Sequence, residues 1–291
     1  MFNYEYGGAM SNIRDEVFLG NNEHYTGILK QIADLAQPEK WTYGKYKVSS
    51  PYKILQNYFE HTYDRIKEEN KFVCSTNGKY RCMNTGLLTI YNQEIFVVFV
   101  KNEKDTGLPW CLNRVCRDTD PFYINNIPKR PEIADYFSDV NDLIYDKKLE
   151  IKLNINHIID DNYERFVEIG LNDKTVINAL LTASKSTLEK RLLRNFKLAL
   201  PFYYHNTSTG DHKIQLLVPL YLAGSPVKLA LVLDKQTSAS GVSYYEAITV
   251  LFVEWAYMNS RLIVKPDDEW ARLIDEADAH TECETIEASI A

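Results

Sequence analysis

His157, Asp161 and Arg165 follow one another at intervals of four residues within the segment 154–166. If this segment forms a helix, the three side chains lie on one of its faces. An imidazole, a carboxylate and a guanidinium in one row can hold a phosphate or move a proton. The same row can equally be a helix that stabilises itself through Asp161 and Arg165, with His157 filling the first turn. The segment therefore indicates either a candidate site or a structural network.

Other polar side chains extend this candidate site. The basic run 185–197 ends in Lys197, where a helix gives way to a strand; such a run suits a phosphate backbone or is the solvated side of a helix. Tyr204 can stack on a base, and Gln215 interrupts an apolar strand with an amide that needs a partner. The candidate catalytic residues are His157 and Arg165, and the candidate ligand-binding residues are Asn84, Thr85, Asn154, Asn162, Lys197, Tyr204, Gln215, Asn259 and Arg261.

Known catalytic signatures are missing from the chain. It has no P-loop, no Gly-x-Gly-x-x-Gly after a strand and no Gly-x-Ser-x-Gly. The cysteines lack the Cys-x-x-Cys spacing of a structural zinc site, so we expect no metal site, and no cofactor is indicated. His-x-Thr occurs at His24 and at His205, in polar settings rather than in apolar strands. None of these patterns identifies a reaction.

The hydrophobic pattern predicts an α+β fold with a central, mainly antiparallel sheet and helices packed on it. Strands cluster in hairpins, of which the one around Asn77-Gly78 has the strongest turn signal. We expect a flexible lead or a weak edge element over 1–25, a single domain over 26–266 and an acidic tail over 267–291 that is disordered beyond a short helix. The expected helices are 26–35, 51–70, 128–137, 155–166, 173–196 and one ending near 263, and the expected strands are 72–74, 80–83, 87–91, 94–101, 110–116, 149–153, 198–204, 213–222, 227–234 and 244–251.

The net charge of −7 belongs to the end of the chain. Residues 267–291 hold nine acids and one base, which leaves 31 acids and 32 bases in residues 1–266. A nearly neutral body does not exclude a polyanionic partner and does not require one. No apolar run reaches the length of a membrane span, and the first residues do not resemble a signal peptide, so we expect a cytoplasmic protein with reduced thiols.

Several short segments, in consistent order from about residue 27 to 271, resemble the bacterial domain of unknown function 3825 family. They are 35–41 (LAQPEKW), 57–65 (NYFEHTYDR), 83–87 (MNTGL), 142–145 (DLIY), 154–166, 200–204 (LPFYY), 215–220 (QLLVPL) and 255–262 (WAYMNSRL). Proteins of this family look like bacterial cytoplasmic proteins, in some cases joined to RNA-binding modules. The resemblance thus implies a role on RNA or nucleotides and supplies no reaction.

The preferred hypothesis is an RNA- or nucleotide-binding protein with a polar, phosphate-gripping pocket. Arg165, Arg261 and Lys197 would hold phosphate, Gln215 and the asparagines would contact base or sugar, and Tyr204 would stack. One alternative is a phosphodiesterase or nucleotide hydrolase with His157 as general acid or base. Another is a protein-interaction module that uses the acidic tail. The oligomeric state is not predicted.

Overall fold

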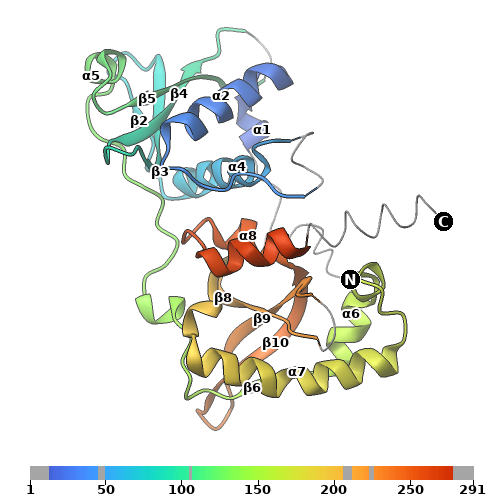
Figure 1. Cartoon of the computed structure of the whole chain (residues 1–291). Helices are drawn as coiled ribbons and strands as arrows, with labels where there is room; N and C mark the ends of the chain where they lie inside the picture. The colour runs from blue at the N-terminus through green and yellow to red at the C-terminus, as the bar shows by residue number, and fades with distance from the viewer. Residues whose placement is uncertain (1–12, 45–49, 105–106, 206–211, 223–225, 278–291) are drawn as a thin grey trace, which may run out of the picture. The chain divides into compact units, whose positions relative to one another are not determined.

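The computed structural model describes residues 13–44, 50–104, 107–205, 212–222 and 226–277, and the chain forms two compact units (Figure 1). The N-terminal unit runs from Met10 to Tyr136 and the C-terminal unit from Phe137 onward. The predicted single domain over 26–266 spans both. Each unit has its own five-stranded sheet, so the predicted α+β class with mainly antiparallel pairing is confirmed, but the strands belong to two sheets rather than one.

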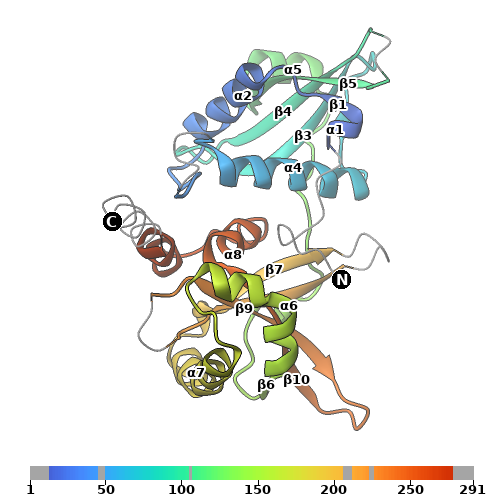
Figure 2. The ribbon, with the colours of Figure 1, turned by 90° about the vertical axis from the view of Figure 1, so that its right-hand side faces the viewer.

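In the N-terminal unit, helices cover both faces of the sheet (Figures 1 and 2). The longest of them buries seven side chains at helical spacing, from Ile54 to Ile66, against the strands. β1 pairs with β5 in parallel, and the remaining neighbours pair antiparallel. The elements are α1 (Ile13–Glu16), β1 (Val17–Phe18), α2 (Asn22–Leu35), α4 (Lys53–Glu68), β2 (Val73–Cys74), β3 (Tyr80–Leu88), β4 (Glu94–Lys101), β5 (Trp110–Arg117) and α5 (Pro121–Asn126), with strand order β1-β5-β4-β3-β2.

The C-terminal unit repeats the layering with a second sheet of order β6-β10-β9-β8-β7. α6 and α7 bury Ile158, Phe166, Ile177, Leu181 and Leu188 in one core with the strands. α8 contacts β7, β8, β9 and β10, yet none of its residues belongs to that core, so it covers the other face (Figure 2). The elements are η1 (Val140–Leu143), β6 (Ile151–Leu153), α6 (Ile155–Glu168), α7 (Lys174–Arg194), η2 (Phe196–Leu198), β7 (Leu200–His205), β8 (His212–Pro219), β9 (Leu229–Thr237), β10 (Ser243–Phe252) and α8 (Val253–Ser260).

Two segments differ from the sequence prediction. Residues 128–137 form no helix, because Pro128 and Pro131 lack backbone donors and restrict the residues before them; α5 forms earlier instead. The part of the expected lead that the structure describes contains α1, β1 and the start of α2, which Asn21 caps by accepting from the His24 N–H. Residues 1–12 lie outside the described residues.

At the C-terminal end, the short helix expected in the acidic tail is present. Residues 268–277 of the expected acidic tail form a helix whose Trp270, Leu273 and Ile274 are buried. The Trp270 indole Nε1 donates to the Leu198 carbonyl at 3.2 Å. This helix is therefore part of the C-terminal unit, and residues 278–291 lie outside the described residues. None of the described helices combines the length and the hydrophobicity that crossing a bilayer requires.

Candidate functional site

His157 lies in the first turn of α6, on the solvent side. Asn154 caps this helix, with its Oδ1 accepting from the His157 backbone N–H at 3.4 Å. The His157 Nδ1 is 3.4 Å from an oxygen of Asp161, and both side chains are more than half exposed. An exposed pair at this distance contributes little to stability. Two residues of the predicted row, His157 and Asp161, therefore form an exposed pair on the solvent side of α6.

Arg165 has a different environment, because α6 bends at Asn162 (φ −126°, ψ 19°). The Asn162 Nδ2 donates to the Ile158 carbonyl, and its Oδ1 accepts from the Thr249 hydroxyl at 2.7 Å and from the Arg165 guanidinium. Arg165 also donates to the Val250 carbonyl at 2.6 Å. The structure thus brings Arg165 and Asn162 together, in a network that fastens α6 to β10.

Tyr204 and Gln215 lie on one face of the second sheet. Phe202 pairs with Gln215 and Tyr204 pairs with Lys213, so the alternation of side chains places all four on the same face. Gln215 is buried. Neighbouring Lys213 is paired at 2.5 Å with Asp234, which is buried on β9.

Asn259 lies in α8, and Arg261 is the C-cap residue of this helix. α8 contacts strands β7 to β10. Asn259 and Arg261 are both buried, and the Asn259 Nδ2 has no hydrogen-bond partner among the described residues. A buried amide without a partner is costly and needs an explanation, which a ligand or a water would give. The roles predicted for Gln215, Asn259 and Arg261 stay predictions.

Asn84 and Thr85 belong to the N-terminal unit, and their polar atoms are engaged inside it. The Asn84 Nδ2 donates to Glu94 at 3.0 Å and to the Pro131 carbonyl at 3.2 Å, while its Oδ1 accepts from the Gly86 N–H. The Thr85 hydroxyl donates to the Ile95 carbonyl at 2.7 Å. These bonds hold the irregular stretch of β3 where its pairing with β4 shifts register.

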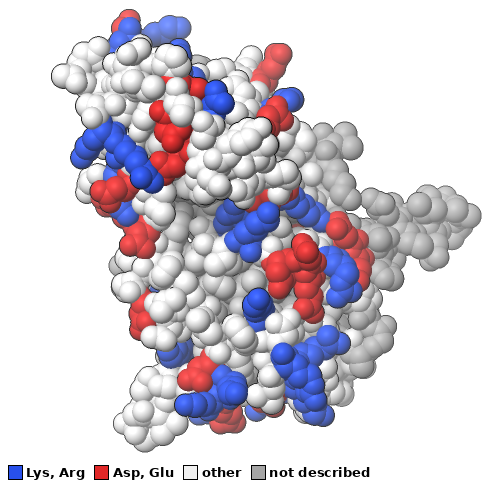
Figure 3. Space-filling model, turned by 60° about the vertical axis from the view of Figure 1, so that its left-hand side comes forward, with Lys and Arg blue, Asp and Glu red and all other residues white. Residues whose placement is uncertain are grey.

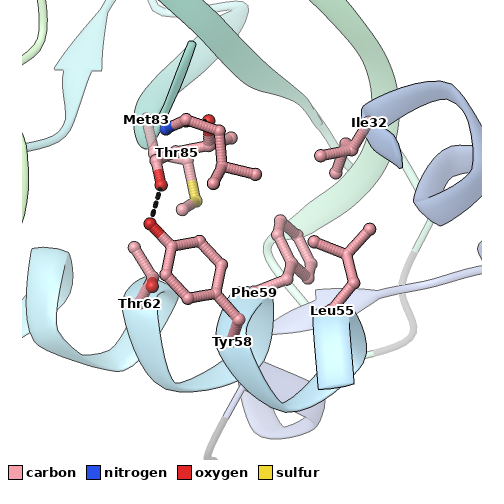
Figure 4. A pocket seen from close by; sticks show the side chains of 8 residues that line it. Ile32, Leu55, Tyr58, Phe59, Thr62, Met83 and Thr85 are labelled. Atoms are coloured by element: carbon pink, nitrogen blue, oxygen red, sulfur yellow. Dashed lines mark hydrogen bonds between the residues drawn. The ribbon is translucent and has the colours of Figure 1, made fainter. Parts of the chain in front are cut away.

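Thr85 also lines a narrow, apolar space between β3, α2 and α4. In Figure 4 the Tyr58 ring lies beside this space and its hydroxyl donates to the Thr85 carbonyl at 2.6 Å. Its apolar lining includes Ile32, Leu55 and Phe59. The space has no room for a water-sized probe, so it is a packing gap rather than a ligand site.

Lys197 lines a pocket of about 310 Å³ in the C-terminal unit. The pocket lies where η1, η2, the start of β7 and the chain before helix 268–277 meet. Two bonds hold these pieces: the Trp270 bond to the Leu198 carbonyl, and a 3.0 Å bond from the Asn195 Nδ2 to Glu269. The lining residues are Leu143, Ile144, Phe196, Lys197, Ala199, Leu200, Pro201, Lys265 and Asp267.

The charge of this pocket is positive but small. Two ammonium groups, of Lys197 and Lys265, and one carboxylate, of Asp267, line it. Asp267 also caps helix 268–277, because its Oδ1 accepts from the Trp270 N–H at 3.3 Å. Among the described residues no carboxylate pairs with Lys197. On the face of the molecule in Figure 3, acidic and basic side chains are intermixed and separated by uncharged surface.

The sequence prediction included Lys197 and missed the rest of this pocket. Phe196 is 52% exposed, although it is a large aromatic residue. Its spacing indicated a buried side chain instead, because Phe196 lies four residues after the buried Leu192; the helix ends at Arg194, and Phe196 falls in η2. Lys265 and Asp267 gave no signal, because only the fold brings them to η2.

Comparison with known proteins gives one match. A family model described as "domain of unknown function (DUF3825)" matches residues 32–270, which is most of the chain. No curated protein and no solved structure matches. The expected resemblance is thus confirmed over nearly the predicted stretch, and the chain belongs to the domain of unknown function 3825 family.

Proposed function

We propose that the C-terminal unit binds RNA or a nucleotide in the pocket formed by η1, η2 and the chain before helix 268–277. The observation that carries this proposal is the pair Phe196 and Lys197: an exposed aromatic ring beside an exposed ammonium group that no described carboxylate neutralises. An aromatic ring stacks on a base of any sequence, and an ammonium group holds a phosphate.

The pocket suits a ligand with an apolar ring and an anionic end. Its volume of about 310 Å³ is at the small end of the range for small-molecule sites. Leu143, Ala199 and Leu200 supply apolar surface for a base, while Lys197 supplies positive charge for a phosphate. Asp267 disfavours a second anionic group at the same point and can accept from the N–H donors of a base.

No reaction is proposed. The imidazole of His157 faces Asp161 in solvent, and Arg165 is engaged with Asn162 and the Val250 carbonyl. A general acid or base acts on a substrate held within hydrogen-bonding distance. The pocket that contains Lys197 has neither His157 nor Arg165 in its lining.

The experiment measures binding of AMP, UMP and a labelled oligouridylate of about eight nucleotides to the full-length protein, by calorimetry and fluorescence anisotropy. Phe196→Ala removes the stacking surface and is expected to weaken binding by about 1–3 kcal/mol, or roughly 5-fold to 150-fold. Lys197→Ala removes one exposed charge and is expected to cost about 1 kcal/mol, or roughly 5-fold.

Lys174→Ala is the matched control, because Lys174 starts α7 and is paired at 2.7 Å with Asp160. It removes the same charge at the first residue of α7, outside the pocket lining, and we expect it to bind like the wild type. Binding should also weaken as salt rises, since phosphate contacts release counterions. The proposal is overturned if none of the three ligands binds, or if Phe196→Ala and Lys197→Ala bind as the wild type does.

A further inference from the structure

The C-terminal end of α7 carries further exposed cations, of which Lys190 and Arg194 lead toward Lys197. We call these three residues the basic ridge. Among the described residues no carboxylate pairs with any of them. By contrast, Lys174 and Lys185 on the same helix are each within 4 Å of a carboxylate. Unneutralised positive charge is thus concentrated at the end of α7 that adjoins the pocket.

Two large apolar side chains are exposed along the basic ridge. Leu193 is 60% exposed and Phe196 is 52% exposed, while Leu188 and Leu192 of the same stretch are buried in the core. A helix side that serves only for solvation carries polar residues at such positions. Cations interleaved with exposed apolar and aromatic groups are the surface that single-stranded nucleic acid requires, because it presents phosphates and base faces together.

Local structure explains part of this arrangement but not all of it. Cations near a helix C-terminus interact favourably with its carbonyl groups, and the Arg194 guanidinium donates to the Lys190 carbonyl at 2.8 Å. This accounts for Arg194, whose remaining donors point to solvent. It does not account for Lys197, which follows the helix, or for the exposure of Leu193 and Phe196.

The spacing of the ridge requires a ligand with several phosphates. Lys190 and Arg194 are one helical turn apart, about 6 Å along the axis, and Lys197 lies beyond the end of the helix. One phosphate of a mononucleotide bound in the pocket can meet Lys197 but cannot also meet Lys190. A strand that leaves the pocket along the ridge presents a phosphate to each cation in turn.

We propose that the ligand is single-stranded RNA, with one base held in the pocket on Phe196 and successive phosphates on Lys197, Arg194 and Lys190. This rests on the proposed function and narrows it from a nucleotide to a strand. Recognition is independent of sequence along the ridge, because Lys and Arg contact phosphates there and no side chain is placed to read base edges.

The test is a length series of oligouridylates, from UMP to about eight nucleotides, measured against the full-length protein at several salt concentrations. We expect affinity to rise with length until three phosphates are covered, with a salt slope of about −2 for three contacts on a single strand. Lys190→Ala and Arg194→Ala should each weaken the longer strands about 5-fold and reduce that slope by about 0.7, while binding of UMP stays unchanged.

Arg194→Lys separates charge from side-chain shape, and we expect it to retain most of the affinity for the longer strands. Lys185→Ala, at an ion-paired position on the same helix, should bind like the wild type. Equal affinity and equal salt slope for UMP and the longer strands would overturn this inference while the proposed function stands. Absence of binding to every member of the series removes the proposed function itself. Binding to phosphatidylserine vesicles, with none to RNA, would assign the basic ridge to anionic lipid instead.

Discussion

Replacing Arg165 by alanine tests whether this guanidinium belongs to the fold of the C-terminal unit. The substitution removes its bonds to the Val250 carbonyl and to the Asn162 Oδ1, together with a longer contact of 3.4 Å to the Thr249 hydroxyl. Hydrogen bonds to charged groups contribute about 1.5–3 kcal/mol each. Because Arg165 is partly exposed and the two bonds are not additive, we expect Arg165→Ala to lower the free energy of unfolding by about 2–4 kcal/mol.

The assay is urea denaturation followed by tryptophan fluorescence, which Trp255 and Trp270 report for this unit. A loss of 2–4 kcal/mol with an ordinary urea dependence shifts the midpoint by about 1–2 M. Arg194→Ala is the matched control: an exposed arginine of the same unit, expected to change stability by less than about 0.5 kcal/mol.

A double-mutant cycle with Thr249→Val measures the network directly. Thr249 and Arg165 both donate to the Asn162 Oδ1, so we expect their effects to be non-additive by about 0.5–3 kcal/mol. If Arg165→Ala unfolds within about 0.5 kcal/mol of the wild type, the structural reasoning is refuted. A stable Arg165→Ala protein that no longer binds RNA would assign Arg165 to the ligand, as the sequence prediction had it.

Three further predictions concern the N-terminal unit. Gly86 has φ +74°, and an added Cβ would lie 2.9 Å from the Tyr58 hydroxyl oxygen. Gly86→Ala is therefore expected to lower the free energy of unfolding, measured by urea denaturation, by about 1–3 kcal/mol. An unchanged urea midpoint would contradict this. Cys82 and Cys116 are buried whereas Cys74 is exposed, so peptide mapping after thiol alkylation of the folded protein should find the label on Cys74 and not on the other two until urea is added. Burial, with a smaller effect of a nearby aspartate, raises the pKa of Cys116 from 9.0 to about 12. The unfolded chain therefore loses the thiol proton at lower pH than the folded chain does. The contribution of this thiol to the free energy of unfolding is complete below pH 9 and should be lost between pH 9 and 12, so stability should fall less steeply with pH in Cys116→Ala. Equal pH profiles of the variant and the wild type would contradict the raised pKa of Cys116.

Local patterns were sufficient to predict most elements. The apolar spacing from Ile54 to Ile66 gave α4, and Asn77-Gly78 gave the β2–β3 turn, because each depends on neighbours in sequence. The division into two sheets was not predictable in this way, since no local pattern specifies which strands pair. β3 was predicted as two strands, but it continues to Leu88 because side-chain bonds of Asn84 and Thr85 hold its irregular stretch.

The candidate site was less predictable for a related reason. Residue type shows that Asn84 or Arg165 can bind a ligand, but it does not show whether the fold has already engaged their polar atoms. Lys197 was predicted from its charge and position; it is exposed, and no carboxylate within the described part of the chain pairs with it. The pocket around Lys197 also needs Lys265 and Asp267, which lie far along the chain and meet η2 only in the folded unit.

Two irregularities in the backbone explain why polar residues gather between α6 and β10. The helix departs from regular geometry at Asn162, and the pairing of β10 with β9 shifts register between Ala247 and Thr249. Backbone groups at such points need partners, which the side chains of Asn162 and Arg165 provide at Ile158 and Val250. This network therefore has a sufficient cause within the fold. No comparable cause accounts for Lys197, which pairs with no carboxylate of the described residues, beside an exposed Phe196; for that reason a ligand is inferred there and not at α6.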